Sequence, residues 1–217
     1  MIDGFGYLVV GAVAALVTFA LTPLVAWFAH RVGWVVAPDE RRVHTRTTPD
    51  VGGIAMFGGF LAAMGVAWSM GRFRPLFADN SEALGIVLAC TLVFAVGLVD
   101  DVRELSAPAK VTGIVVAGIV LVIFGVTMYY FRVPFLDVFV LGQDWVPLVT
   151  VIWLLGMTQA INLIDGLDGL AAGIVGIGAV AFFIYSRRLD HLDLLGSQNL
   201  GPLVAIIAAG LCVGFLP

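Results

Sequence analysis

The sequence contains few charged residues: they make up 12% of its 217 residues, against about 25% in an ordinary soluble domain. Hydrophobic residues make up 61%, and the mean hydropathy is +1.07. A soluble protein of this composition would have too little polar surface to cover itself. The formal net charge of −4 provides no basic surface, so we expect no nucleic-acid partner.

Cysteine and histidine are also scarce. The two cysteines, Cys90 and Cys212, lie inside apolar runs, without CxxC or nearby histidine spacing. The sequence therefore does not support a disulfide or a thiolate metal site. We expect both to be buried as small hydrophobic side chains. No internal repeat or low-complexity linker interrupts the sequence, so residues 1–217 are predicted to form a single transmembrane domain.

Long runs without Asp, Glu, Lys or Arg dominate the sequence instead. Each is close to the 17–25 apolar residues, about 20 on average, that cross the hydrocarbon layer of a membrane. We therefore predict an all-α, polytopic membrane protein, a bundle of about seven transmembrane helices. The predicted helices cover residues 4–29, 51–71, 83–99, 111–131, 145–164, 169–186 and 194–217.

The first charged connection predicts the orientation. Asp3 precedes the first helix, and four arginines follow it, at positions 31, 41, 42 and 46. The positive-inside rule therefore places the amino terminus outside the cell and this connection in the cytoplasm. We expect a multi-pass protein of the inner (plasma) membrane. Connections 30–50, 100–110 and 162–168 then share the cytoplasmic face, because successive helices alternate in direction.

The first connection is the most charged part of the chain, running from Ala37 to Arg46. It either serves only to set the orientation or contacts an anionic phosphate ligand or lipid headgroup. The candidate binding residues are Arg41, His44 and Arg46, with Arg42 beside them. The next connection, residues 72–82, is predicted to be a simple connector.

Asp100 and Asp101 end the third predicted helix, at the negative end of its dipole, where carboxylates are unfavourable by about 0.3–1 kcal/mol each. We expect compensation by water, by Arg103 and Lys110, or by a bound cation. A solvated loop is the alternative interpretation.

A second polar segment separates the fifth and sixth predicted helices. Asn162, Asp165 and Asp168 follow one another at intervals of three, which would place them along one ridge if the backbone were helical. Asp168 could instead cap the following helix.

Carboxylates without cysteine or closely spaced histidine form a set of hard oxygen ligands. Such a set suits Mg²⁺, with Mn²⁺ as the alternative, better than zinc. Because Mg²⁺ fills its remaining positions with water and substrate phosphates, a diphosphate substrate is indicated. One aspartate could then accept a proton from, or orient, the attacking oxygen, which at a membrane surface could belong to a lipid phosphate.

The polar segments together resemble a known family. Val99–Ser106 with Lys110, and Asn162–Ala171, are similar to the two signature loops of the polyprenyl-phosphate N-acetylhexosamine-1-phosphate transferases. Pro38–Thr45, followed by Gly52–Ala55, resembles that family's first cytoplasmic loop. The form is closer to the branch that starts teichoic acid, O-antigen or arabinogalactan-linker synthesis than to the branch that makes the first peptidoglycan lipid.

The resemblance implies the transfer of a sugar 1-phosphate from a UDP-N-acetylhexosamine to undecaprenyl or decaprenyl phosphate, with Mg²⁺ and release of UMP. It assigns Asp100 and Asp101 to metal–diphosphate binding or to activation of the lipid phosphate. Asn162, Asp165 and Asp168 fall at the motif implicated in nucleotide-sugar binding and catalysis. The role of Lys110, and whether the protein forms a homodimer, are left open.

Two alternatives remain at this stage. The sequence stops just before a further Asp motif and a His-containing loop of the family, so we expect it to be truncated, and an inactive fragment or scaffold is one alternative. An ion or solute transporter is the other, because acidic residues in membrane helices often mark ion pathways. A transporter would carry its acids near the middle of several helices.

Overall fold

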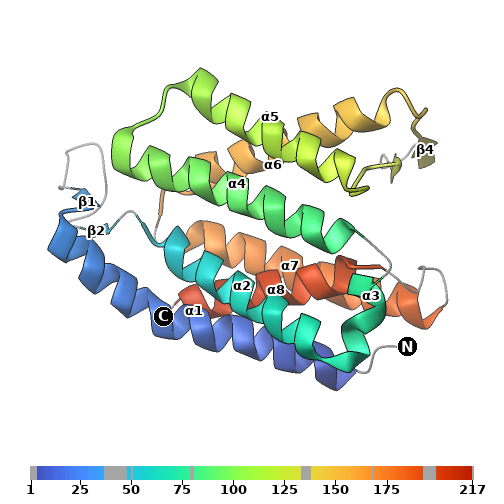
Figure 1. The fold of residues 1–217 in the computed structure, drawn as a ribbon, viewed down its shortest axis with the longest axis horizontal. Coiled ribbons are helices and arrows are strands. Elements are labelled where there is room, and N and C mark those ends of the chain that lie inside the picture. The colour runs from blue at the N-terminus through green and yellow to red at the C-terminus, as the bar shows by residue number, and fades with distance from the viewer. Residues whose placement is uncertain are drawn as a thin grey trace. The chain divides into compact units, whose positions relative to one another are not determined.

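The structure is a computed structural model that describes residues 4–36, 48–49, 51–78, 81–132, 138–167, 169–192 and 199–216. It is dominated by helices, which confirms the predicted all-α class (Figure 1). The helices are α1 (Gly4–Val32), α2 (Gly53–Ser69), the 3₁₀ turn η1 (Gly71–Phe73), α3 (Arg74–Ala78), α4 (Glu82–Arg103), α5 (Ala107–Ile123), α6 (Val146–Ile164), α7 (Leu170–His191) and α8 (Gly201–Phe215). Two short antiparallel pairs join β1 (Val35–Val36) to β2 (Thr48–Pro49) and β3 (Tyr130–Arg132) to β4 (Val138–Val140).

Within the described residues, four helices are long and apolar enough to cross a membrane: α1, α4, α6 and α7. A fifth span results if α2 and the η1–α3 segment, which bend by 87°, are counted as one. Helices α5 and α8 have 17 and 15 residues. At 1.5 Å per residue they are about 25 and 22 Å long, shorter than the roughly 30 Å hydrocarbon layer. The polytopic membrane fold is confirmed, whereas the count of seven spans is not.

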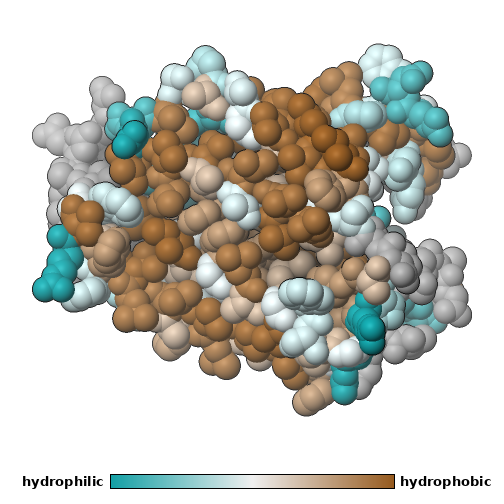
Figure 2. Space-filling view, in the orientation of Figure 1, coloured by the Kyte–Doolittle hydropathy of each residue, from teal (hydrophilic) through white to brown (hydrophobic). Residues whose placement is uncertain are grey.

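The surface has the composition that such helices require. Only 6% of the most apolar window of α6, and of α7, is buried inside the protein. Figure 2 shows hydrophobic side chains over most of the visible face and hydrophilic ones mainly at its margins. An apolar surface of this extent needs the hydrocarbon layer as its solvent.

One predicted helix is too long. The apolar run 111–131 predicted helix as far as Phe131, but α5 ends at Ile123. Gly125 has a φ of +88°, a left-handed backbone conformation that closes the helix, and Tyr130 then pairs with Val140 in a strand ladder. The absence of charge could not locate this end, because no charged residue follows the turn before Arg132.

Two predicted connections are helical. Residues 72–82 are not a simple connector, because η1 and α3 occupy most of them and fully bury Phe73 and Leu76. The predicted loop 187–193 is also corrected: α7 continues to His191, and Arg187 pairs with Asp190 inside it at 2.8 Å. At α8, the described helix begins at Gly201 rather than at residue 194.

The chain packs into two compact units: residues 1–80 with 164–217, and residues 81–163. In the first unit, α8 is the central helix and contacts α1, α2 and α7. Its side chains are buried around most of its circumference, with Leu203, Ile207 and Cys212 at most 2% exposed. The predicted burial of Cys212 is confirmed; Cys90 is half-buried.

Glycines allow the helices of this unit to approach closely. A Cβ at Gly210 would collide with the Gly11 carbonyl of α1, and one at Gly214 would collide with the Ala15 carbonyl. Gly59 of α2 meets the Thr18 hydroxyl in the same way. A Cβ at Gly176 would lie 3.1 Å from the Cys212 side chain, so α7 and α8 also approach closely at this position.

The second unit contains α4, α5 and most of α6. Glycines again set the spacing of α4 and α5, because a Cβ at Gly113 would collide with Val96 and one at Gly85 with Phe124. Helix α6 joins α5 where Gly118 faces Val151. The buried Thr150 hydroxyl accepts a hydrogen bond from the Met128 amide at 2.9 Å and fixes the segment after α5.

These contacts predict opposite effects for two Gly→Ala substitutions. Gly214→Ala forces a methyl group against the Ala15 carbonyl, and overpacking of this kind costs about 1–3 kcal/mol. Gly178→Ala in α7 meets no atom within 4 Å and gains up to about 1 kcal/mol of helix propensity. Thermal unfolding of the purified protein should therefore show a lower Tm for Gly214→Ala and an unchanged or higher Tm for Gly178→Ala. A Gly214→Ala protein as stable as the wild type would contradict the α1–α8 packing.

Candidate functional site

The first acidic pair lies inside a helix and not in a loop. Helix α4 continues four residues beyond its predicted end at Val99, so Asp100 and Asp101 occupy its last turn. The chain then leaves the helix at Glu104, whose φ of 47° is in the left-handed region and whose amide donates to the Asp100 carbonyl at 2.9 Å. Helix α5 begins three residues later and brings Lys110 back in its first turn.

Both carboxylate oxygens of Asp100 have partners. The Leu105 amide donates to Oδ1 at 2.9 Å, and the Lys110 ammonium lies 2.6 Å from Oδ2. The two side chains are 26% and 33% exposed, so water screens the ion pair and its stabilisation is at the modest end, about 0–1 kcal/mol. The amide-to-carboxylate bond is worth more, roughly 1.5–3 kcal/mol.

This arrangement resolves the unfavourable position of Asp100 at the negative end of the α4 dipole. Of the predicted sources of compensation, the structure shows Lys110, and it adds the Leu105 amide, which the sequence did not indicate. Asp100 therefore fixes the turn between α4 and α5. Asp101, the next residue, is exposed, as is Arg103.

The second polar segment is only partly helical. Helix α6 ends at Ile164, so the predicted ridge stops after Asn162, and Asp165 lies in the connection to α7. Asn162 and Asp165 are both exposed, and Asp168 lies outside the described residues. The Gly166 amide donates to the Ile164 carbonyl at 2.8 Å, which turns the chain immediately after Asp165. The N-cap residue of α7 is Gly169, whose φ is 74°.

Two of the predicted functional segments meet the same end of α8. A Cβ at Gly169, at the start of α7, would lie 3.0 Å from Leu216. A Cβ at Gly52, at the start of α2, would lie 2.8 Å from the ring of Phe215. Two turns therefore lie at one end of this unit, as the alternation of helices predicted. One is the Asp165 turn, and the other follows the charged first connection (37–46), which we call the Arg/His connection.

The Arg/His connection itself, with Arg41, His44 and Arg46, lies outside the described residues. Its two ends are described and are joined by the β1–β2 pair, in which Val35 faces Pro49 and Val36 faces Thr48. Both ends of the connection are thus held beside the start of α2.

The donor chemistry of the described segments suits a hard cation. Asp101 and Asp165 offer exposed carboxylates, and Mg²⁺ uses only one or two of these in addition to water and phosphate oxygens. No group of three His, Cys, Asp or Glu side chains that could hold a metal forms among the residues that the structure describes. The described residues are compatible with Mg²⁺ bound together with a phosphate substrate.

Comparison with known proteins identifies the family. Glycosyl transferase family 4 matches residues 83–217, which include both acidic segments. The chain belongs to this family. Among curated relatives of the chain, the decaprenyl-phosphate N-acetylglucosaminephosphotransferase of Mycobacterium leprae is 37% identical over 212 residues, covering 96% of this chain and 53% of the relative.

Other relatives of this glycosyl transferase family 4 chain have related names. The undecaprenyl-phosphate alpha-N-acetylglucosaminyl 1-phosphate transferase of Thermotoga maritima is 32% identical over 160 residues, 74% of this chain and 46% of the relative. A phospho-N-acetylmuramoyl-pentapeptide-transferase of Desulforudis audaxviator is 34% identical over 235 residues, 97% and 69% of the two chains. The chain spans about half the length of the first relatives it matches. No solved structure matches it significantly.

Sequence reasoning missed two features of this glycosyl transferase family 4 unit. It did not single out Phe215 and Leu216, which contact the two functional turns, because a pair of apolar residues at a helix end carries no chemical signal. It also missed Gly210 and Gly214, although their spacing of four is the small-residue pattern that marks close helix contact.

The role of Asp100 in fixing the turn can be tested by amide hydrogen exchange. Asp100→Ala removes the acceptor of the Leu105 amide, whereas Asp100→Asn keeps a carbonyl oxygen in a position to accept. We expect exchange at Leu105 to accelerate about tenfold in Asp100→Ala, equivalent to about 1.4 kcal/mol, and much less in Asp100→Asn. Asp101→Ala is the matched control and should leave Leu105 protected. Equal protection in the wild type and Asp100→Ala would show that the carboxylate does not hold the turn.

Proposed function

We propose that the protein transfers N-acetylhexosamine 1-phosphate, most simply GlcNAc 1-phosphate, from a UDP-sugar to polyprenyl phosphate. An oxygen of the lipid phosphate attacks the sugar-linked phosphorus of the UDP-sugar, and the bond to the UMP oxygen breaks. The products are polyprenyl-diphosphate-sugar and UMP, so no redox partner is needed. The observation that carries the proposal is the match to glycosyl transferase family 4 across both acidic segments, among relatives named for polyprenyl-phosphate GlcNAc phosphotransfer.

The positions of the acids support transfer over transport. Within the described residues, every Asp and Glu lies at a helix end or in a connection. Ionised groups at helix ends can meet a water-soluble nucleotide sugar and a lipid phosphate at the membrane surface. A conduction pathway would need such groups deeper in the apolar segments. The acids of the described residues therefore favour transfer over transport.

The structure suggests different roles for the two adjacent acids. Asp100 already accepts from Leu105 and pairs with Lys110, so we assign it to positioning. Asp101 is the exposed member of the pair, and we propose it as the ligand of Mg²⁺ or of the metal-bound diphosphate. When bound, the cation would neutralise the charge that develops on the transferred phosphoryl group.

The Asp165 turn is the proposed binding region for the nucleotide sugar. Asn162 offers an amide that can donate to and accept from a base or sugar, and Asp165 can orient the attacking oxygen or accept its proton. Arg41, His44 and Arg46 are proposed to contact phosphate from the first connection, whose ends lie on the same side of the first unit as the Asp165 turn. We propose Asp168 as a further catalytic carboxylate.

The reaction can be tested in membranes that contain the protein expressed from its complete gene. Labelled UDP-GlcNAc, polyprenyl phosphate and Mg²⁺ should yield a labelled lipid, and chelation of the metal should stop its formation. We expect Asp101→Asn and Asp165→Asn to lower the rate about 100-fold or more, because each removes a charge that acts in the transition state.

The matched control for these variants is Asp144→Asn. Asp144 is an exposed carboxylate just before α6, in the connection that alternation places away from the acidic segments, and its loss should change the rate less than about twofold. A protein that forms no labelled lipid, or one whose activity survives both Asp101→Asn and Asp165→Asn, would refute the proposal.

A further inference from the structure

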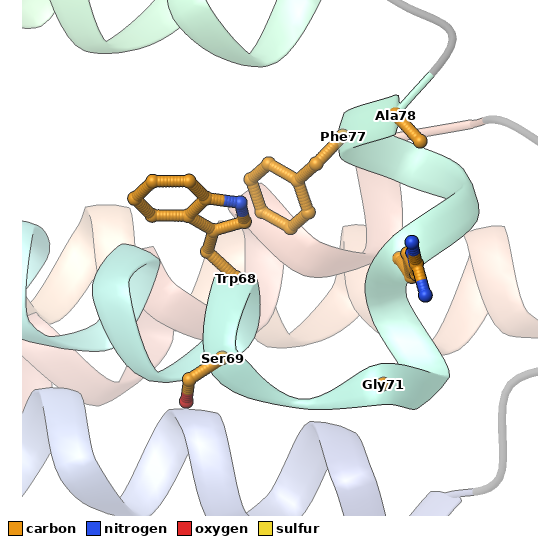
Figure 3. Close-up of a pocket in the computed structure, with 6 residues that line it drawn as sticks. Trp68, Ser69, Gly71, Phe77 and Ala78 are labelled. Atoms are coloured by element: carbon orange, nitrogen blue, oxygen red, sulfur yellow. The ribbon is translucent and has the colours of Figure 1, made fainter.

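A pocket lies in the bend between α2 and α3, at the end of the first unit opposite the Asp165 turn. It has a volume of about 310 Å³ and forms where the chain turns by 87° after Ser69. Figure 3 shows the indole of Trp68 and the ring of Phe77 reaching into the space beside the bend from its two arms. We call this space the bend pocket; its lining residues are Trp68, Ser69, Gly71, Arg74, Phe77 and Ala78.

Buried contacts hold the bend in place. Phe73 and Leu76 are 0% exposed, and the ring of Phe73 meets that of Tyr7 edge to face, with centroids 5.2 Å apart. The amide of Phe73 donates to the Met70 carbonyl at 3.0 Å across the turn itself. The bend pocket is therefore built into the fold and does not depend on a ligand to form it.

The two arginines of the bend have different roles. Arg72 folds back onto α1, where its guanidinium lies 6.0 Å from the centroid of the Phe5 ring. Arg74 lines the bend pocket and is exposed. Among the residues that the structure describes, no hydrogen bond or ion pair to Arg74 is present. The pocket thus presents a planar cation whose five N–H donors are available to an outside partner.

The lining combines this cation with apolar aromatic walls. A guanidinium pairs with phosphate oxygens through two parallel hydrogen bonds, which favours arginine at phosphate sites. Trp68 stands near the end of the apolar helix α2, and tryptophan is enriched at the level of lipid headgroups. The volume is at the small end of ligand pockets, about 300–1,000 Å³, and suits a headgroup better than a nucleotide sugar.

We propose that the bend pocket binds the phosphate of a membrane phospholipid. Arg74 pairs with the phosphate oxygens, while Trp68 and Phe77 pack against the glycerol and the first methylenes of the acyl chains. An anionic headgroup is favoured because Arg74 pairs with no carboxylate in the part of the chain that the structure describes. No bond is made or broken, and the site is separate from the proposed transfer site and independent of it.

Free phosphate could supply the same anion, and the aromatic walls separate the two sources. A free ion would gain from Arg74 alone, whereas a lipid would also gain from the apolar contact with Trp68. Trp68 is 73% exposed and carries little of the packing of α2, so its replacement tests the pocket without disturbing the fold.

The test is native mass spectrometry of the purified protein, titrated with phosphatidylglycerol or phosphatidylcholine. We expect the wild type to retain phosphatidylglycerol in preference, and Arg74→Gln to bind it at least tenfold more weakly. Trp68→Ala should also weaken binding several-fold, and 10-fold excess inorganic phosphate should leave the bound lipid in place. An unchanged Tm confirms that each variant is folded.

The matched control is Arg188→Gln, which removes one exposed positive charge from α7 at the same end of the unit but outside the bend pocket. It should change lipid binding less than twofold. The proposal is overturned if Arg74→Gln binds lipid like the wild type, or if Arg188→Gln weakens binding as much, which would indicate only bulk surface charge. It is equally overturned if Trp68→Ala has no effect or phosphate displaces the lipid, since the occupant would then be a free anion. If Arg74→Gln does not fold, the Trp68→Ala and phosphate measurements decide the matter.

Discussion

Among the residues that the structure describes, carboxylates lie only at helix ends or in connections, as expected because an unpaired charge deeper in a membrane costs several kcal/mol. The described acids obey this constraint, at the ends of α4 and α6 above all. The proposed transfer would therefore take place at the membrane surface, where a soluble sugar nucleotide and a lipid phosphate can meet. Apolar helices packed through glycines supply a support on which short polar turns are held.

The turn between α4 and α5 shows how one carboxylate can prepare the position of another. Asp100 ties the end of α4 to the Leu105 amide and to Lys110 of α5. That network stabilises the negative charge of Asp100 at an unfavourable helix end. It also fixes the backbone from which the exposed Asp101 side chain projects. We therefore propose that the two adjacent acids have different roles, one positioning the turn and one binding the ligand, a difference that the sequence motif does not express.

Much of the architecture could be predicted from the sequence, because charge-free runs report directly on membrane helices. Helix α6 matched its predicted range almost residue for residue. Helix ends were less predictable: Gly125 ends α5 within apolar sequence, and the sequence does not distinguish the helical bend at Phe73 from a connector. For the candidate site, the residue types could be predicted, and so could the position of two turns at the same end of the first unit. The partners of Asp100 could not, because they depend on backbone geometry that residue spacing does not encode.

Side-specific cysteine labelling tests the central proposal, which is that the acidic turns share one membrane face. With Cys90 and Cys212, the only cysteines, replaced by alanine, single cysteines at Ser106 and Leu167 report on the two turns, and one at Gln143 reports on the connection before α6. A membrane-impermeant maleimide should label Ser106→Cys and Leu167→Cys only in inside-out vesicles and Gln143→Cys only in right-side-out vesicles. Labelling of Ser106→Cys and Leu167→Cys from opposite sides would contradict the account.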